Sequence, residues 1–288
     1  MALIELKDVS YVYGKGTAFE KTALKDINLT IEKGEFIGLI GHTGSGKSTL
    51  VQQLNGLLSP HTGSVLIKGK DISKMGSELR RVRQKIGLVF QYPEYQLFEE
   101  TISKDIAFGP RNQGLNEEDI NERVKEAMES VGLSYEKYKD KSPFNLSGGQ
   151  KRRVAIAGVL AMKPEVLILD EPTAGLDPEG REEILGEIKE IYKKGDITIV
   201  IVSHSMEDMA KIAERIIVMK KGEIFMDDKP KNIFAREEEL LEIGLGVPQV
   251  TRFMKRLKDK GLPVDGICIT VEEAKAQLEE ILRGKKDV

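Results

Sequence analysis

The stretch Glu35-Phe36-Ile37-Gly38-Leu39-Ile40-Gly41-His42-Thr43-Gly44-Ser45-Gly46-Lys47-Ser48 decides the fold. Its first six residues are nearly all apolar, which predicts a short strand buried in a parallel sheet. Residues 41–48 then match the pattern G-x-x-x-x-G-K-[ST] at every fixed position. Apolar residues at helical spacing follow, and Ser59-Pro60 is expected to end that helix. The order of strand, glycine-rich loop and helix predicts a phosphate-binding loop in an α/β core.

The chemistry of this loop follows from its residue types. Glycines leave backbone N–H groups free to surround phosphate oxygens. Lys47 would place its charge on the β- and γ-phosphates, and the Ser48 hydroxyl would ligate Mg²⁺. The residues predicted to bind nucleotide here are Gly41, Thr43, Gly44, Ser45, Gly46, Lys47, Ser48 and Thr49. The structural alternative is a glycine-rich turn that only caps a helix, and the flanking strand and helix disfavour it.

Polar residues end three further apolar runs, at Asp170-Glu171, His204 and Gln91. Because the carboxyl ends of parallel strands meet along one edge of a sheet, these side chains would share a crevice. Asp170 would hold Mg²⁺, Glu171 would orient or deprotonate an attacking water, and His204 would contact a phosphate oxygen or the water. The predicted catalytic residues are Glu171, His204, Lys47 and Gln91, and the predicted metal ligands are Ser48, Gln91 and Asp170.

Other aromatic and imidazole side chains carry weaker indications. Tyr13 would either stack on an adenine or fill the core, and the sequence leaves both readings open. His42 and His61 lie in predicted loops or turns, and we assign neither a role. Two acids after an apolar run, or a histidine at a strand end, are ordinary structural features when they occur without a phosphate-binding loop.

The segment Leu146-Ser147-Gly148-Gly149-Gln150 predicts a second anion site. Ser147 has the character of a helix N-cap, and two glycines open the first turn of a helical run that ends near Pro164. Free N–H groups at the positive end of a helix dipole attract phosphate. The segment therefore supplies half of a phosphate site, a hundred residues away from the loop at 41–48.

Periodicity divides the chain into a core, an insert and a tail. Strand-like runs surround residues 92–164, where helical periodicity dominates, and a hairpin at 215–227 would close the core. In the tail, Pro248 would open one amphipathic helix and Thr270 another. The predicted class is α/β with a mixed, mainly parallel sheet and an N-terminal antiparallel part. Its expected divisions are residues 1–231, with the helical subdomain inserted at about 92–164, and a helical extension at 232–288.

Composition excludes several function classes. The 288 residues carry 44 basic and 47 acidic side chains, a net charge of −3, so no basic footprint for nucleic acid or lipid is expected. One cysteine and three histidines exclude an intrachain disulfide and an ordinary structural zinc site. No apolar run reaches the roughly 18 residues of a transmembrane helix, and no secretory signal is present, so a location in the cytosol is expected.

Taken together, the motifs resemble the nucleotide-binding subunit of ATP-binding cassette (ABC) proteins over roughly residues 3–230, with a P-loop NTPase fold. The segment 146–150, which we call the signature segment, carries the resemblance because simple P-loop enzymes lack it. The resemblance implies ATP and Mg²⁺ as ligands and a head-to-tail dimer in which Ser147 and Gly149 close over the partner's ATP. The residues implied at this interface are Ser147, Gly148, Gly149, Gln150 and Asp177.

A narrower resemblance rests on residues 90–101 (FQYPEYQLFEET) and 105–110 (DIAFGP). They are similar to the energy-coupling factor (ECF) ATPases, which power uptake of vitamins and of cobalt or nickel, and specifically to the second of two paralogous subunits. The implied partners are a paralogous ATPase or a second copy, an integral membrane coupling subunit and a substrate-binding membrane subunit. The implied place is the cytoplasmic face of the cell membrane, without a lipid anchor. The tail is expected to dimerise.

Two points stay open at this stage. Pro93, Tyr95, Leu97 and Phe98 would either dock a helix of the membrane subunit or fill the core of the insert. The cassette motifs also occur in nucleic-acid ATPases of the chromosome-maintenance type, but those carry a long coiled coil where this chain has a compact insert. A scaffold without hydrolysis would be expected to lack Glu171 or His204. The ATPase of a conventional importer or exporter is the main alternative.

Overall fold

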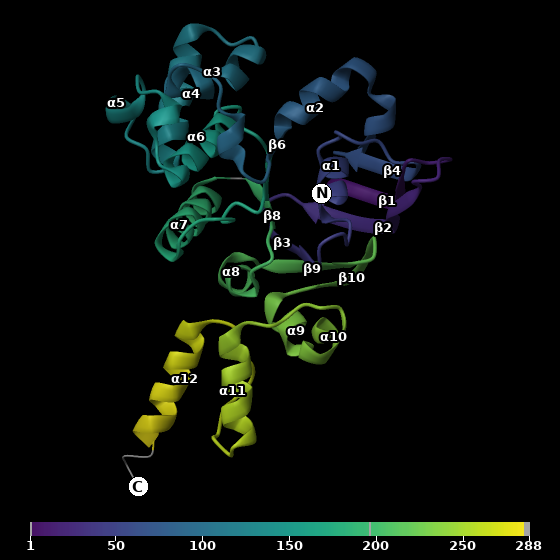
Figure 1. The fold of residues 1–288 in the computed structure, drawn as a ribbon, viewed down its shortest axis with the longest axis vertical. Helices are drawn as coiled ribbons and strands as arrows, with labels where there is room; N and C mark the ends of the chain where they lie inside the picture. The colour runs from purple at the N-terminus through teal and green to yellow at the C-terminus, as the bar shows by residue number, and fades with distance from the viewer. Residues whose placement is uncertain (1, 196, 285–288) are drawn as a thin grey trace.

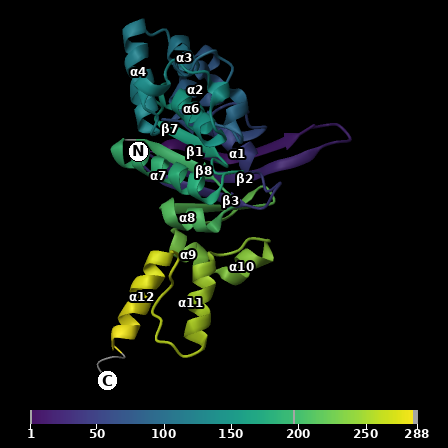
Figure 2. The same cartoon turned by 60° about the vertical axis from the view of Figure 1, so that its left-hand side comes forward.

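The computed structural model describes residues 2–195 and 197–284 and has three parts. Two β-sheets form a core, a helical arm stands at one end of it, and a helical tail extends from the other end (Figures 1 and 2). The core and arm correspond to the α/β body and the helical insert that the sequence predicts.

The larger sheet has the strand order β10-β9-β3-β8-β7-β6, and all of its neighbouring pairs are parallel except β9 and β10. Its strands are β3 (Phe36–Gly41), β6 (Ile86–Val89), β7 (Val166–Asp170), β8 (Thr198–Val202), β9 (Arg215–Lys220) and β10 (Glu223–Asp228). Every residue of β3 and β8 is buried, which explains why the sequence of these strands is almost entirely apolar.

The smaller sheet is antiparallel with the order β2-β1-β4-β5. Its strands are β1 (Ala2–Tyr13), β2 (Lys21–Glu32), β4 (Thr62–Ile67) and β5 (Lys70–Asp71). The second strand begins as early as Lys21, because Lys21 and Leu24 pair with Tyr13 and Tyr11 of β1. This long-range pairing has no signature in the local sequence pattern.

Four α-helices surround the core sheets. They are α1 (Lys47–Leu54), α2 (Leu79–Lys85), α7 (Pro178–Lys194) and α8 (Met206–Ile212), with short 3₁₀ turns at Ile72–Lys74 and Gly76–Glu78. The prediction that the first helix continues to Ser59-Pro60 is wrong. It ends at Leu54 because Gly56 has a φ of +71°, a left-handed conformation that terminates a helix, and Leu57 is 44% exposed.

The arm lies between β6 and β7 and is helical, as predicted. Its elements are the 3₁₀ turn Pro93–Gln96, α3 (Ile102–Asn112), α4 (Glu117–Ser130), α5 (Tyr135–Tyr138), the 3₁₀ turn Pro143–Asn145 and α6 (Gly148–Leu160). One apolar cluster runs from the larger sheet into the arm and includes Ile106 of α3 and Val154 of α6. The arm is thus packed continuously onto the sheet that carries the strand-end residues.

The tail contains more structure than the sequence predicts. The two predicted helices are present as α11 (Gln249–Asp259) and α12 (Val271–Gly284), and both project away from the core (Figure 1). They are preceded by α9 (Pro230–Ala235) and α10 (Glu237–Glu242), which the sequence analysis missed. Phe234 and Leu240 join the main apolar cluster, whereas α11 and α12 enclose a separate small cluster around Met254 and Ala274.

None of the helices in the described residues has the length and apolarity needed to span a membrane.

Candidate functional site

Most of the nucleotide-binding residues predicted in the loop at 41–49 and at the strand ends line one cavity of about 430 Å³, which we call the nucleotide cavity. It lies at the carboxyl ends of β3, β6, β7 and β8, as expected for an α/β sheet. The side chains and backbone that line it are Tyr13, Lys21, Ala23, Thr43, Gly44, Gly46, Lys47, Ser48, Thr49, Gln91, Asp170, Glu171, Val202 and His204. The four predicted catalytic residues and the three predicted metal ligands therefore share a single cavity.

The phosphate-binding loop has a shape that requires glycine. Gly46 has a φ of +106°, and a Cβ atom there would lie 2.5 Å from the carbonyl oxygen of Ala23 in β2. At Gly41 a Cβ atom would lie 2.6 Å from the Ser45 Oγ. Gly41 and Ser45 do not line the cavity, and the buried Ser45 hydroxyl has no hydrogen-bond partner in the described structure. Such a loop leaves room for phosphate groups against its backbone.

Two backbone carbonyls of the loop hold the Lys47 ammonium group in place. Its Nζ donates hydrogen bonds to the carbonyl oxygens of Gly41, at 2.7 Å, and His42, at 3.2 Å. Only 7% of Lys47 is exposed. Burial lowers the pKa of Lys47, and the nearby carboxylates of Glu171 and Asp170 oppose that shift. A preorganised ammonium group at the phosphate-binding loop is well placed to bind polyphosphate.

The two carboxyl groups at the end of β7 have different environments. Burial raises the pKa of Asp170, and Lys47 opposes the shift. Burial, followed by the charge of Asp170, raises the pKa of Glu171 to about 7. Glu171 also has a φ of +50°, a strained conformation for a non-glycine residue that is typical of functional sites. A carboxyl group with a pKa near neutrality is suited to accepting a proton from water.

His204 lies beside Glu171, as the strand-end argument predicts. The His204 Nε2 atom is 3.1 Å from Glu171 Oε1, and the imidazole side chain is 52% exposed at the cavity. Burial, followed by the charge of Lys47, lowers the pKa of His204, which favours the neutral imidazole. The neutral ring retains one donor and one acceptor for a phosphate oxygen or a water.

Tyr13 belongs to the cavity and is not a core residue. It is 41% exposed, and its hydroxyl is 3.2 Å from Thr49 Oγ1, within hydrogen-bond distance. The ring packs edge-on against Tyr11, whose other neighbour is the imidazole of His61. His61 accepts a hydrogen bond from the backbone N–H of Val12, so it supports the strand that carries Tyr13. This arrangement favours the reading in which Tyr13 stacks on a base.

Sequence reasoning missed three residues that line the nucleotide cavity, Lys21, Ala23 and Val202, the last residue of β8. Lys21 and Ala23 lie at the start of β2, which pairs antiparallel with the end of β1 beside Tyr13. The sequence feature that could have revealed Lys21 and Ala23 is the loop between the first two strands. Residues just after such a loop pair with those just before it, which include Tyr13.

The signature segment lines a second hollow of about 480 Å³, the signature hollow, which shares no residue with the nucleotide cavity. It is formed by Ser147, Gly148, Gly149, Gln150, Arg153, Gly175, Leu176, Asp177, Glu179, Gly180, Glu183 and Ile184. Ser147 is the predicted N-cap of α6 and forms a full capping box with Gln150. Asp177 caps α7 in the same hollow. One chain thus carries two separate half-sites.

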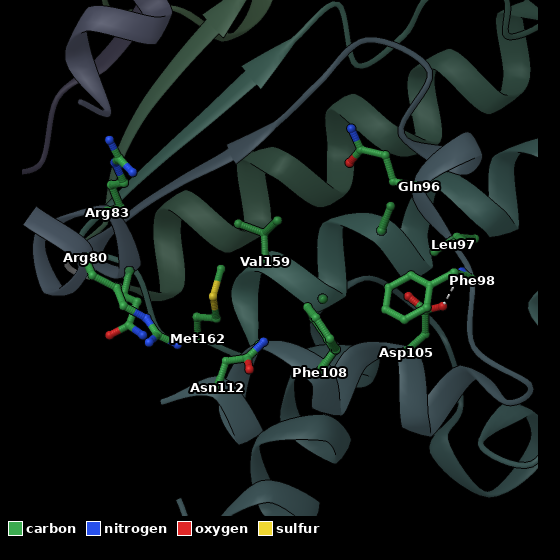
Figure 3. A pocket seen from close by; sticks show the side chains of 14 residues that line it. Arg80, Arg83, Gln96, Leu97, Phe98, Asp105, Phe108, Asn112, Val159 and Met162 are labelled. Carbon is green, nitrogen blue, oxygen red and sulfur yellow. Dashed lines mark hydrogen bonds between the residues drawn. The ribbon is translucent and has the colours of Figure 1, made fainter. Parts of the chain in front are cut away.

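A third hollow, the arm groove, occupies the surface between α2, α3 and α6 (Figure 3). It measures about 490 Å³ and is lined by Arg80, Arg83, Gln84, Gln96, Leu97, Phe98, Asp105, Phe108, Gly109, Asn112, Ala155, Gly158, Val159 and Met162. The rings of Phe98 and Phe108 meet edge-to-face with centroids 5.1 Å apart. Phe98 is 56% exposed and Phe108 49%.

The four insert residues with an open role divide into two pairs. Pro93 and Leu97 are buried and belong to the packing of the arm, and Leu97 also forms part of the wall of the arm groove. Tyr95 and Phe98 are exposed, and only Phe98 of these two lines the arm groove. The sequence could not separate the pairs because all four residues are apolar or aromatic.

Oxygen donors in the nucleotide cavity fit a hard divalent cation. The Ser48 hydroxyl, the Gln91 side-chain amide and the Asp170 carboxyl are the kinds of ligand that Mg²⁺ accepts alongside phosphate oxygens. The cavity can thus hold a polyphosphate on a glycine-rich loop, neutralise its charge and present a carboxyl group to water. These are the functions that an active site needs in order to hydrolyse a phosphoric anhydride.

Comparison with known proteins agrees with this chemistry. Residues 24–174 match the family described as ABC transporter. The energy-coupling factor transporter ATP-binding protein EcfA2 of Clostridium tetani is 59% identical over 282 residues, covering 98% of each chain. The protein of the same name from Clostridium perfringens is also 59% identical, over 97% of this chain and 98% of that relative.

Two solved structures extend the likeness to three dimensions. That of cbiO1 from Clostridium perfringens, described as part of the ABC transporter complex cbiONQ, is 40% identical with a TM-score of 0.75 and covers 88% of this chain and 99% of that chain. A dimeric, post-hydrolysis structure of the ATP-binding cassette MJ0796 with ADP and Pi is 33% identical with a TM-score of 0.70 and covers 79% and 98%. The chain therefore belongs to the ABC transporter family and, within it, to the ATP-binding proteins of energy-coupling factor transporters.

Proposed function

We propose that this chain hydrolyses ATP to power import of a micronutrient, a vitamin or a cobalt or nickel ion, as one ATPase subunit of an energy-coupling factor transporter. Its place is the cytoplasmic face of the cell membrane, where contacts with protein hold it. The observation that carries the proposal is that one chain holds two half-sites, the nucleotide cavity and the signature hollow, which share no lining residue. Full-length relatives at 59% identity support the ECF type over a conventional importer or exporter.

The separate half-sites are joined when two ATPase subunits, two copies or paralogues, meet head to tail. ATP bound to the phosphate-binding loop of one subunit then gains the N–H groups at the start of the partner's α6, which the capping box of Ser147 and Gln150 holds ready. A ligand shifts a conformational equilibrium by contacts that exist in only one of the states. Closure of the dimer is therefore the step that ATP binding drives.

Hydrolysis depends on the residues at the strand ends. Glu171 orients the attacking water and accepts its proton, and His204 donates a hydrogen bond to the phosphate or the water. Lys47 holds the β- and γ-phosphates while negative charge develops on them. Ser48, Gln91 and Asp170 would hold Mg²⁺, which when bound supplies further charge neutralisation. Loss of phosphate removes the contacts that keep the dimer closed, so the subunits separate.

The arm groove transmits this movement to the membrane coupling subunit. Its aromatic pair consists of Phe98, in the segment after Gln91, and Phe108, in α3 (Figure 3). The groove therefore lies on the arm that also carries the signature segment and would move with it. Apolar side chains at about half exposure in a concave surface are typical anchors for a partner's helix. We assign the groove to a helix of the membrane coupling subunit.

Phe108→Asp should reduce copurification with the membrane coupling subunit in mild detergent by about tenfold or more, because a charge replaces an exposed apolar anchor. ATP hydrolysis by the purified ATPase should stay within about twofold of wild type. The matched control is Phe19→Asp, a phenylalanine that is 89% exposed in the loop between β1 and β2, outside the groove. Normal copurification of the Phe108 variant would refute the docking role. If no integral membrane protein copurifies with wild type, the transport function itself is wrong.

The tail supports the ATPase dimer when ATP is absent. Helices α11 and α12 enclose only a small apolar cluster of their own. They leave apolar side chains on the outside, with Phe253 52%, Val271 62% and Leu282 63% exposed. We assign this surface to association between ATPase subunits, since exposed apolar groups on two adjacent helices gain stability by mutual burial.

Deleting residues 249–288 should weaken association of ATPase subunits without ATP by about tenfold or more, measured by sedimentation equilibrium, since the deletion removes α11 and α12. The cut must not be made earlier. A cut near residue 236 would remove Leu240 and Val247 from the main core, whereas deletion of 249–288 removes Ile269 from it, so the earlier cut would destabilise the ATPase body more. An unchanged dissociation constant for the shortened chain would contradict the dimerisation role.

A further inference from the structure

Arg152 is a buried guanidinium at the junction of three functional segments. It lies on α6, two residues after the signature segment, and only 1% of it is exposed. Its Nη1 donates hydrogen bonds to the carbonyl oxygens of Pro172, at 2.8 Å, and Ala174, at 2.9 Å. Its Nη2 donates to both carboxylate oxygens of Glu94, at 3.2 and 3.3 Å. Arg152 does not line the nucleotide cavity, so direct contact with nucleotide does not explain its role.

The segments that Arg152 joins adjoin the predicted γ-phosphate site. Pro172 and Ala174 follow directly after Glu171, the residue predicted to activate water. Glu94 lies in the 3₁₀ turn Pro93–Gln96, just after Gln91. Tyr92, between Gln91 and this turn, has a left-handed φ of +55°, so a sharp bend links the two. The guanidinium thus contacts the chain after both Gln91 and Glu171, while its own helix presents the signature segment.

We propose that Arg152 is a positioning residue that couples the subunit's own γ-phosphate site to the signature segment it presents to the partner. The inference rests on the head-to-tail dimer proposed above. Nucleotide bound in the cavity of one subunit would shift the signature segment of that subunit through the contacts of Arg152. The shift would then act on the nucleotide cavity of the partner. If the chain after Gln91 or after Glu171 moves when that residue contacts nucleotide, Arg152 must move with it. Otherwise the hydrogen bonds between Arg152 and that part of the chain would break.

The chemistry of the contact explains why the coupling is stiff. A guanidinium keeps its charge inside a protein and offers a planar fork of donors, so one side chain can satisfy two backbone carbonyls and a carboxylate at once. Glu94 is 17% exposed at its side chain and is the carboxylate that compensates the buried charge. Breaking one arm of a buried ion pair strands the other charge, which opposes independent movement of the three segments.

Arg152→Lys tests the proposal in a Glu171→Gln background, where hydrolysis is blocked and closed dimers are expected to accumulate. Lysine keeps the charge and loses the fork. We expect the ATP-dependent dimer dissociation constant, measured by sedimentation velocity, to rise by about tenfold or more, while affinity for a fluorescent ADP analogue in the dilute monomer changes less than about twofold. An equal loss of ADP affinity would assign Arg152 a merely structural role and overturn the proposal, as would unchanged dimerisation.

Glu94→Gln gives an independent reading, because it leaves the carbonyl contacts of Arg152 and its helix intact. It should weaken dimerisation in the same way, and the double variant should be no worse than the poorer single variant. Fully additive effects would contradict a shared contact. The matched control is Arg215→Lys, because the guanidinium of Arg215 is likewise paired, here with the carboxylates of Asp227 and Glu35, but lies outside the three hollows. It should leave dimerisation unchanged. If the Glu171→Gln parent forms no ATP-dependent dimers, the proposed function fails and this inference fails with it.

Discussion

Replacing Glu171 by glutamine should reduce steady-state ATP hydrolysis by about 100-fold or more, whereas ATP binding persists and closed dimers accumulate. Glutamine keeps the shape of the side chain but cannot accept the proton of the attacking water. The residues that hold the phosphates are unchanged, so the ATP-bound closed dimer still forms. It does not open again because hydrolysis is blocked. Phosphate release and sedimentation velocity with ATP measure the two effects.

The matched control for this substitution is Glu165→Gln. Glu165 stands immediately before β7, at the end of the strand opposite to Glu171, and its carboxylate pairs with Lys68 and Lys85. This variant should hydrolyse ATP at nearly the wild-type rate. Wild-type turnover by Glu171→Gln would show that another group activates the water.

The same Glu171→Gln variant should change stability in a manner that depends on pH. Burial raises the pKa of Glu171 from 4.5 to about 7, so between these values the folded chain holds a proton that the unfolded chain has lost. The stability contribution of the wild-type carboxyl group therefore falls as pH rises through this window. The advantage of glutamine in unfolding free energy should be about 2 kcal/mol larger at pH 8 than at pH 5. Urea unfolding of the nucleotide-free chain measures it, and an equal advantage at both pH values would contradict the raised pKa.

Lys47→Ala should weaken ATP binding by about 100-fold, since a charge-assisted contact to phosphate contributes roughly 1.5–3 kcal/mol. The ammonium group is already buried and fixed by two loop carbonyls, so little ordering opposes its binding to phosphate. Removing it also leaves Asp170 and Glu171 without the nearby cation. The loss should be much smaller for AMP, which lacks the β- and γ-phosphates. Calorimetric titration with both nucleotides tests this difference.

Lys193→Ala is the control for Lys47→Ala. Lys193 lies near the end of α7, pairs with Glu190 on the surface and does not line the nucleotide cavity. Its removal should leave ATP affinity unchanged. An equal loss of AMP and ATP affinity in the Lys47 variant would mean that the substitution had disturbed the loop as a whole.

The strand ends were the most predictable part of the molecule. Gln91, Glu171 and His204 each follow an apolar run, and the topology of a parallel sheet brings such positions to one edge. The loop at 41–48 could be predicted for the same reason, because its glycine spacing has a direct geometric cause. The separation of the signature segment from its own nucleotide cavity is also consistent with the sequence, which places the two a hundred residues apart.

Features that depend on contacts between distant segments could not be predicted. The early start of β2 at Lys21 comes from pairing with β1, and helix α9 is stabilised by placing Phe234 in the main core. In the signature helix, Arg152 and Arg153 are adjacent and chemically identical. Only the fold shows that Arg152 is enclosed between Glu94 and the chain after Glu171, whereas Arg153 contacts α7.

We propose that the signature segment acts on the ATP of another subunit. The most direct measurement compares Glu171→Gln with Glu171→Gln/Ser147→Arg by sedimentation velocity with ATP, using the chain with itself and with any ATPase subunit that copurifies with it. The added arginine side chain would obstruct the phosphate side of the partner's site. We expect ATP-dependent dimers for the first variant, monomers for the second, and the same nucleotide affinity for both as dilute monomers. Loss of nucleotide affinity in the Ser147→Arg monomer, or dimers as abundant as those of the parent, would contradict it.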